Sequence, residues 1–192
     1  MIILASASKS RGDLLRGCGL DIKTIPADLD EDIIKEKGLD VTTTAVELSK
    51  AKAHFISQKY PQSLVIGADQ MMKCEGQRFD KPHSVDQARE QLKFLRGKIH
   101  HLISAVSIYK NETCLWSHHQ RAELEMRPFS DKFLESYLDQ VGSDVCTTVG
   151  GYRLESIGVQ LFNRIEGDYF TILGLPLLAV LDFLRSQDII ET

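Results

Sequence analysis

Three serines and two cations are grouped near the start of the chain, in the segment Ser6-Ala-Ser8-Lys9-Ser10-Arg11. The segment follows the β-type run Ile2 to Ala5 and leads into residues at helical spacing. Backbone N–H groups at the start of a helix, together with hydroxyls and cations, suit a phosphate group. The Gly-Lys-Ser ending of a P-loop is absent, which disfavours that class of NTPase. Simple capping of the helix is the alternative use of the serines.

Two carboxylates are candidates for acid-base or metal chemistry. Asp69 ends the apolar run Leu64 to Ala68, which is typical of a buried strand that delivers a polar group at its C-terminal end. An acid at that place needs a partner or a function, because burying a lone charge is costly. Glu31 lies in an acidic stretch, where a solvated loop acid is the alternative. Mg²⁺ commonly uses one or two carboxylates plus substrate phosphates, so a divalent metal site is a possible use of the pair.

Three lysines could add positive charge to such a site. Lys50 and Lys52 are close in a predicted helix, where ordinary surface lysines are the alternative, and Lys81 precedes Pro82 in a predicted loop. The six histidines form no His-Glu-x-x-His motif and the four cysteines no Cys-x-x-Cys pair. Gly-x-Ser-x-Gly is also absent. The residue types therefore favour metal and phosphate chemistry over zinc, redox or triad chemistry.

Strand and helix patterns are interleaved along the chain, which predicts an α/β fold with a mixed sheet. The expected strands are Ile2 to Ala5, Asp21 to Ile25, Leu64 to Asp69, Leu102 to Tyr109, Thr113 to Met126, Val159 to Ile165 and Tyr169 to Leu173. The expected helices are one from Arg11 to Cys18, one from about Thr44 to Tyr60, one around Ala88 to Leu95, one from about Ser130 to Val141, and a closing helix with Pro176 in its first turn. The residues Lys110-Asn111-Glu112 suggest a hairpin turn.

Length and charge narrow the class of protein. A chain of 192 residues with 43% hydrophobic and 26% charged residues is expected to form one globular domain. The formal net charge of −4 argues against a nucleic-acid partner, which would need a basic excess. The longest apolar run, Phe170 to Leu184, is short for a membrane span and is interrupted by Asp182, so no membrane contact is expected. No signal peptide is recognisable, and a cytoplasmic protein is predicted.

Several short segments together resemble a known family. They are Ile3-Leu-Ala-Ser-Ala-Ser8 with Arg11, Lys50-Ala-Lys52-Ala, Ile66-Gly-Ala-Asp69, Lys81-Pro82, Ile165-Glu-Gly-Asp168-Tyr and Leu173-Gly-Leu-Pro176. Each is modest alone, but their joint order and spacing resemble the Maf family of nucleoside triphosphate pyrophosphatases nearly from end to end.

The resemblance implies a single bilobed domain over residues 1–192, with an elongated mixed sheet, flanking helices and two lobes around a central cleft. It also implies an enzyme that cleaves a nucleoside triphosphate between the α- and β-phosphates with Mg²⁺ or Mn²⁺, as house-cleaning of non-standard nucleotides. A homodimer is an open alternative to a monomer.

The family's functional residues map onto named positions of this chain. Asp69 matches the catalytic acid, Glu31 with Asp69 the metal-holding acids, and Ser8, Arg11, Lys52 and Lys81 the phosphate-binding set, with Lys50 as a further candidate. Asp69 would act either as base on the attacking water or as a metal ligand, and the sequence leaves both roles open.

Substrate preference is expected to depend on Ser10, Gln70 and Glu155. Gln70 and Glu155 are similar to the branch of the family linked to 7-methylguanosine triphosphate, whereas the branch associated with thymidine and uridine triphosphates typically has Thr and Gln there. A carboxylate at Glu155 could accept hydrogen bonds from the guanine N1–H and amino groups. Ser10 stands where that branch tends to have an aromatic residue, and Asp80 replaces a glycine usual before Lys81.

Two other functions remain open. One, which the family resemblance implies, is a nucleotide-binding regulator of septum formation and cell division that needs no catalysis, and Asp69 argues for a hydrolase instead. The other is a phosphatase that removes single phosphates, which would release orthophosphate rather than pyrophosphate.

Overall fold

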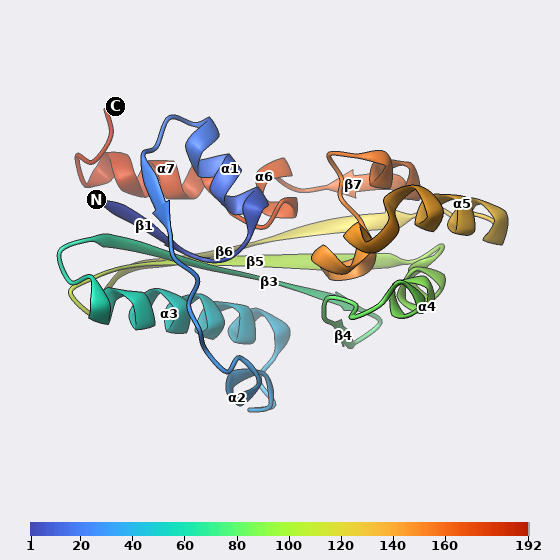
Figure 1. Ribbon diagram of the computed structural model, residues 1–192, viewed down its shortest axis with the longest axis horizontal. Coiled ribbons are helices and arrows are strands. Elements are labelled where there is room, and N and C mark those ends of the chain that lie inside the picture. Colours follow the sequence, from blue (N-terminus) through green and yellow to red (C-terminus); the bar gives the residue numbers. More distant parts are fainter. Residues whose placement is uncertain (192) are drawn as a thin grey trace. The chain divides into compact units, whose positions relative to one another are not determined.

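The computed structural model describes residues 1–191 and shows strands and helices alternating along the chain (Figure 1). The strands are β1 (Ile2–Ala5), β2 (Ile22–Thr24), β3 (Leu64–Cys74), β4 (Gln77–Phe79), β5 (Ile99–Lys110), β6 (Thr113–Met126) and β7 (Phe162–Glu166). The α-helices are α1 (Lys9–Gly17), α2 (Asp32–Lys35), α3 (Val41–Lys59), α4 (Val85–Leu95), α5 (Asp131–Val141), α6 (Tyr169–Ile172) and α7 (Leu177–Ser186). Three short 3₁₀ turns cover Gly142–Thr147, Val149–Gly151 and Ile157–Leu161.

The strands form one mixed sheet, as the sequence predicts. Seven strands of the described chain follow the order β2-β1-β3-β5-β6-β7, with β4 paired to β3. Strand β1 is parallel to both β2 and β3, whereas β3 with β4 and β6 with β7 are antiparallel. The predicted hairpin is confirmed, because β5 and β6 are neighbours in the sheet and only Asn111 and Glu112 separate them. Both residues have positive φ, as a tight two-residue turn requires. The predicted α/β class is therefore correct.

The chain divides into two compact units, each described here by itself. Unit 1 contains Met1–Gln70, Ile103–Gln120 and the chain from Asp168 onward. Unit 2 contains Met71–Leu102 and Arg121–Gly167. Because the cuts fall at Gln70, Leu102 and Gln120, strands β3, β5 and β6 contribute residues to both units.

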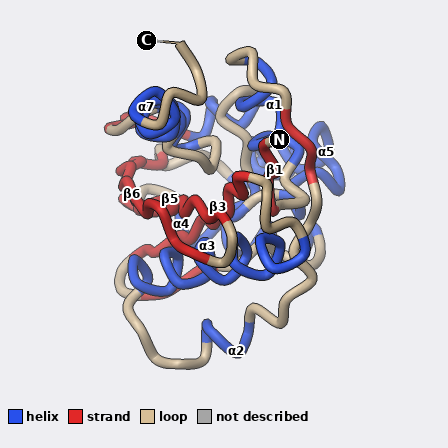
Figure 2. Tube along the Cα trace, turned by 90° about the vertical axis from the view of Figure 1, so that its left-hand side faces the viewer, coloured by secondary structure: helices blue, strands red, loops and turns tan. Residues whose placement is uncertain are grey.

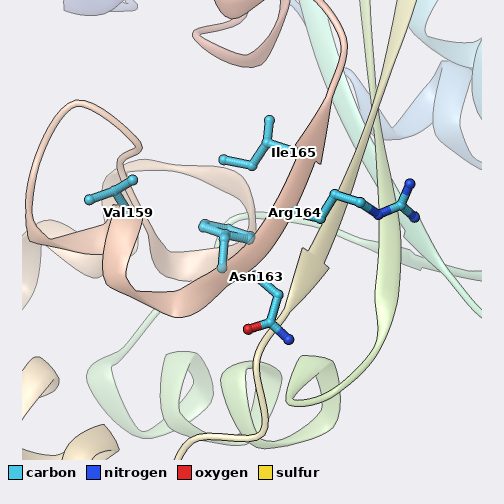
Figure 3. A pocket seen from close by; sticks show the side chains of 5 residues that line it. Val159, Asn163, Arg164 and Ile165 are labelled. Carbon is cyan, nitrogen blue, oxygen red and sulfur yellow. The ribbon is translucent and has the colours of Figure 1, made fainter.

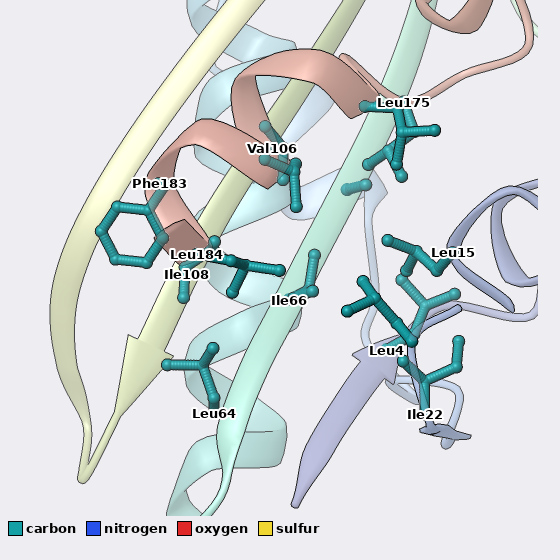
Figure 4. Packing of buried hydrophobic residues seen from close by; sticks show 14 residues of the cluster. Leu4, Leu15, Ile22, Leu64, Ile66, Val106, Ile108, Leu175, Phe183 and Leu184 are labelled. Atoms are coloured by element: carbon teal, nitrogen blue, oxygen red, sulfur yellow. The ribbon is translucent and has the colours of Figure 1, made fainter. Parts of the chain in front are cut away.

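In unit 1, alternate residues of the strands face two different layers of helices. Leu4 and Ile66 belong to the cluster that includes residues of α1 and α7 (Figure 4). Ile3 and Val65, each one position earlier, pack with Ala53 and Ile56 of α3. The period of two along a strand explains this division. Helix α3 therefore covers one face of the unit 1 strands and α7 the other (Figure 2).

Unit 2 has its own core and a buried polar contact. Leu92 and Leu95 of α4 and Leu134 and Leu138 of α5 are almost fully buried. His100 is also buried, and its Nε2 lies 2.7 Å from the hydroxyl of Tyr152. Burial lowers the pKa of His100 to about 4, so this imidazole is neutral near neutral pH.

Some local expectations were wrong or incomplete. The predicted strand Tyr169 to Leu173 is instead helix α6, because the Asp168 carboxylate accepts a hydrogen bond from Thr171 N and caps a helical turn. The acidic stretch after Asp30 contains the short helix α2, and β3 continues five residues beyond Asp69.

Two further boundaries also differ from the prediction. The expected strand from Val159 begins only at Phe162, because the residues before it form a 3₁₀ turn. Strand β4 was not predicted, because three residues are too few for a clear alternation. In residues 1–191, no helix is both long and apolar enough to cross a membrane.

Candidate functional site

The centre of the candidate site in unit 1 is a lysine that bridges two carboxylates. Lys52 Nζ on α3 lies 2.6 Å from Asp69 Oδ1 on β3 and 2.8 Å from Glu31 Oε1. Glu31 is the residue before α2, and Lys35 Nζ approaches its other oxygen at 3.4 Å. Asp69 is 7% exposed, so its charge is balanced mainly by protein groups. The structure thus brings together three of the predicted site residues, namely Glu31, Lys52 and Asp69.

Close packing of α3 on β3 places Lys52 over Asp69. Gly67 lies on the α3 side of β3, two residues before Asp69. A Cβ atom on Gly67 would lie 2.2 Å from the carbonyl oxygen of Ser49 and 2.6 Å from the amide nitrogen of Ala53. These are backbone atoms of α3, so only glycine permits this approach. Lys52 directly precedes Ala53, and the short separation between α3 and β3 lets its ammonium reach Asp69, in the middle of β3.

The charges of the site act on one another. Burial raises the pKa of Asp69, and the positive charges of Lys52 and Arg11 oppose that rise. Partial burial also works to raise the pKa of Glu31, but Lys52 and Lys35 outweigh it and the pKa falls below its ordinary value. Burial lowers the pKa of Arg11, against the attraction of Asp69 and Glu31. The predicted acids and Arg11 therefore share one electrostatic environment.

The serine and arginine segment forms the start of α1, as predicted. Ser8 is the N-cap, and its hydroxyl accepts a hydrogen bond from Arg11 N at 3.4 Å. The Arg11 guanidinium points inward and donates to Gly174 O at 2.8 Å, Ala68 O at 3.0 Å and Ser6 Oγ at 3.2 Å. Because Ala68 precedes Asp69, these bonds connect the start of α1 with the acid at β3. Lys9, the other cation of the segment, pairs with Asp13, and its side chain is 86% exposed.

The two helical lysines have different environments. Lys50 Nζ lies 3.0 Å from Glu47 Oε1 on its own helix, and its side chain is 37% exposed. Lys52 is 11% exposed and meets the carboxylates described above. Residues two apart on a helix point in different directions, so only one of the pair can face β3. Among the described contacts, Lys50 has none with Glu31 or Asp69.

Gln70 binds the turn that contains α6. Its Nε2 donates to Ser104 Oγ at 3.1 Å, Thr171 O at 3.1 Å and Ile172 O at 3.0 Å. A side-chain amide has only two N–H donors, so this nitrogen is already fully used. Any contact between Gln70 and a nucleobase would have to use Oε1, which can only accept.

Residues around α6 were missed by sequence reasoning. The Oγ1 atom of Thr171 lies 2.8 Å from Gln120 Oε1 and 2.9 Å from Asp168 Oδ2. Ser10 Oγ donates to Leu173 O at 3.2 Å, which joins α1 to the same turn. Asp168 is of a residue type preferred at a helix N-cap, and this signal could have indicated the helix. No comparable signal points to Gln120, because its partner is 51 residues away in the chain.

Two predicted residues, Lys81 and Glu155, lie in unit 2. Lys81 is exposed in the loop between β4 and α4, beside the buried Pro82. Glu155 is exposed in a turn that precedes the 3₁₀ segment Ile157–Leu161. Unit 2 also has an open pocket near that turn (Figure 3). It is lined by Val159, Phe162, Asn163, Arg164 and Ile165. It contains neither predicted residue, so it does not extend the candidate site.

The donor set fits a divalent cation that is partly held by substrate. No group of three or more His, Cys, Asp or Glu side chains in residues 1–191 is arranged to hold a metal ion. Glu31 and Asp69 supply two carboxylates, close enough that one ammonium contacts both. Two carboxylates match the way Mg²⁺ is usually bound in nucleotide sites, where phosphates and water complete the coordination.

The sequence was compared with known proteins. The family model described as "Maf-like protein" matches residues 1–187. A "Nucleoside triphosphate pyrophosphatase" of Granulibacter bethesdensis is 47% identical, covering 97% of this chain and 96% of the relative. A protein with the same name from Paramagnetospirillum magneticum is 46% identical, covering 96% of this chain and 97% of the relative. A "7-methyl-GTP pyrophosphatase" of Rhizobium etli is 42% identical, over 99% and 98%.

Proposed function

The chain belongs to the Maf family, and from this premise we propose that it hydrolyses nucleoside triphosphates to nucleoside monophosphates and pyrophosphate. The names of its relatives favour this activity over a regulator that needs no catalysis. The observation that carries the proposal is the buried Asp69 carboxylate paired with Lys52, whose ammonium also contacts Glu31. A binding protein needs only complementary charge for a triphosphate, whereas a hydrolase also needs a group that activates or positions the attacking water, which a carboxylate such as Asp69 can do.

In this proposal, residues of unit 1 bind and orient the triphosphate. The N-terminus of α1, with Ser8, offers backbone N–H groups and the positive end of the helix. Arg11 adds a fixed positive charge beside Asp69. Lys52 supplies three N–H donors and neutralises phosphate charge. Phosphoryl chemistry depends mainly on such positioning and charge neutralisation. Lys50 and Lys81 remain predictions from the sequence for further phosphate contacts.

A divalent cation, Mg²⁺ or Mn²⁺, is part of the proposal. Glu31 and Asp69 would hold it, and when bound it would supply charge neutralisation and Lewis acidity. Asp69 would either share in holding the cation or accept the proton of the attacking water. A cytoplasmic setting is also proposed, since all four cysteines are free. The absence of a nucleic-acid partner remains a prediction from the sequence, and a homodimer remains an open alternative to a monomer.

The products test the proposed function directly. We expect the purified protein with Mg²⁺ or Mn²⁺ to convert a nucleoside triphosphate to equal amounts of monophosphate and pyrophosphate. Anion-exchange chromatography of the nucleotides, with separate assays for pyrophosphate and orthophosphate, measures both. A diphosphate and orthophosphate as the only products would point to a phosphatase that removes single phosphates. Binding without any product would point to the regulator.

Base preference is a separate proposal that rests on Glu155. The carboxylate should favour a guanine edge, whose two adjacent donors it can accept together, over uracil or thymine. We expect kcat/KM for 7-methylguanosine triphosphate or GTP to exceed that for dTTP by about 5–30-fold. Glu155→Gln should reduce this ratio, and Glu90→Gln, an exposed acid of α4, should leave it unchanged. A wild-type protein that prefers dTTP would refute the assignment.

A further inference from the structure

Lys52 is held between the two acids that are proposed to bind the divalent cation. Its ammonium is 2.6 Å from Asp69 Oδ1 and 2.8 Å from Glu31 Oε1, and its side chain is 11% exposed. Both contacts are charge-assisted hydrogen bonds. In this structure, the ammonium therefore lies between the proposed metal ligands and neutralises them.

A cation held by the same two carboxylate oxygens would compete with that ammonium. Mg²⁺ binds oxygen at about 2.0–2.1 Å, closer than a lysine nitrogen does, so it would need the space between the acids. The divalent cation and the Lys52 ammonium also repel each other, because both are positive and little solvent screens them. Lys35 near Glu31 and Arg11 near Asp69 add further positive charge. The free protein is therefore poorly prepared for a divalent cation.

We propose that Lys52 is a built-in counter-ion that excludes the divalent cation until the triphosphate binds. Phosphate oxygens would give the ammonium new partners, and the flexible lysine side chain allows it to move to them. Glu31 and Asp69 would then become available to a cation that also binds the phosphates. Cation and nucleotide binding are thereby coupled through one residue. This inference rests on the proposed function, because it assumes a triphosphate and a cation at this site.

Binding of Mn²⁺ to the free protein tests the inference without catalysis. Electron paramagnetic resonance measures free and bound Mn²⁺ for the wild type, Lys52→Gln, Lys52→Arg and Lys59→Gln. We expect Lys52→Gln to bind Mn²⁺ at least about 10-fold more tightly than the wild type, because the competing charge is gone. Lys52→Arg keeps the charge and should bind as weakly as the wild type. Lys59→Gln removes a lysine from the last turn of α3, near Phe55, and should have no effect.

Addition of an α,β-methylene nucleoside triphosphate, which cannot be cleaved between these phosphates, tests the coupling. It should increase the affinity of the wild type for Mn²⁺ by a larger factor than that of Lys52→Gln. If the analogue increased the Mn²⁺ affinity of both proteins by the same factor, the inference would be overturned. It would also be overturned if Lys52→Gln without the analogue bound Mn²⁺ no more tightly than the wild type. Circular dichroism and thermal melting of each variant check that it folds.

A measurement on the wild type does not depend on the folding of any variant. In protein with ¹³Cε-labelled lysine, saturation with Mg²⁺ and the methylene analogue should shift the Lys52 signal, because the ammonium leaves its carboxylate partners. An unchanged signal at saturation would overturn the inference. The Mn²⁺-binding and lysine-signal measurements do not use turnover. A failure to release pyrophosphate would therefore refute the proposed function, whereas the inference about Lys52 would be decided by these binding measurements alone.

Discussion

Asp69→Asn is expected to lower turnover by about 10²-fold or more while the fold is retained. The substitution removes one charge and changes the side-chain volume little. It removes either the base or a metal-holding oxygen, and each role is typically worth at least this factor. Steady-state release of pyrophosphate, measured at saturating nucleotide and Mg²⁺, gives the change in kcat.

The appropriate control is an acid of the same unit outside the site. Asp182 of α7 pairs with Arg185 and its side chain is 80% exposed, so Asp182→Asn should retain wild-type turnover. Thermal melting is needed for Asp69→Asn, because removing one partner of a buried ion pair can itself destabilise a protein. A folded Asp69→Asn with near wild-type turnover would exclude this carboxylate from the chemistry.

The same variant distinguishes the two roles of Asp69. As a metal ligand, Asp69→Asn should weaken Mn²⁺ binding in the presence of the methylene analogue in proportion to the loss of turnover. As a base, it should lower turnover while Mn²⁺ affinity stays near the wild-type value.

Gly67→Ala should cause the second large effect, although glycine carries no functional group. The new methyl would meet the backbone of α3 at Ser49 and Ala53, with contacts of 2.2 and 2.6 Å that no side-chain rotation can relieve. Helix α3 must therefore move away from β3 and take Lys52 with it. Overpacking of this kind costs about 1–3 kcal/mol of stability, and a shift of about 1 Å in a reacting site can lower the rate by roughly 10²-fold.

Gly17→Ala is the matched control for Gly67→Ala. Gly17 ends α1, and a Cβ there would have no atom within 4 Å apart from its own helix backbone and chain neighbours. This control should keep activity and should be neutral or slightly stabilising, because alanine favours helix over glycine. Urea unfolding and kcat/KM measure both effects. If Gly67→Ala had the activity and stability of the wild type, then the close approach of α3 would not be what positions Lys52.

Most of the secondary structure was predictable because its signals are local. The run Leu64 to Ala68 is apolar on both faces, as befits a strand that has helices on either side. Ser8 and Ser130 precede helical patterns and do cap α1 and α5. The local pattern failed at Tyr169 to Leu173, where apolar residues suggested a strand. The decisive contact there is the hydrogen bond from Thr171 N to the Asp168 carboxylate, which caps a helical turn. This contact does not appear in the pattern of apolar residues.

The sequence by itself determined the α/β class, the family resemblance and the residue types of the candidate site. Asp69 was identifiable because an acid directly after an apolar run is costly to bury without a partner. Only the tertiary structure decided which groups meet it. It selected Lys52 rather than Lys50, and it turned the donors of Gln70 toward Thr171 and Ile172. The choice of Lys52 depends on the rotation of α3 and its separation from β3. The bonds of Gln70 depend on the position of the α6 turn beside β3. Both are set by packing between residues distant in the chain and leave no local pattern.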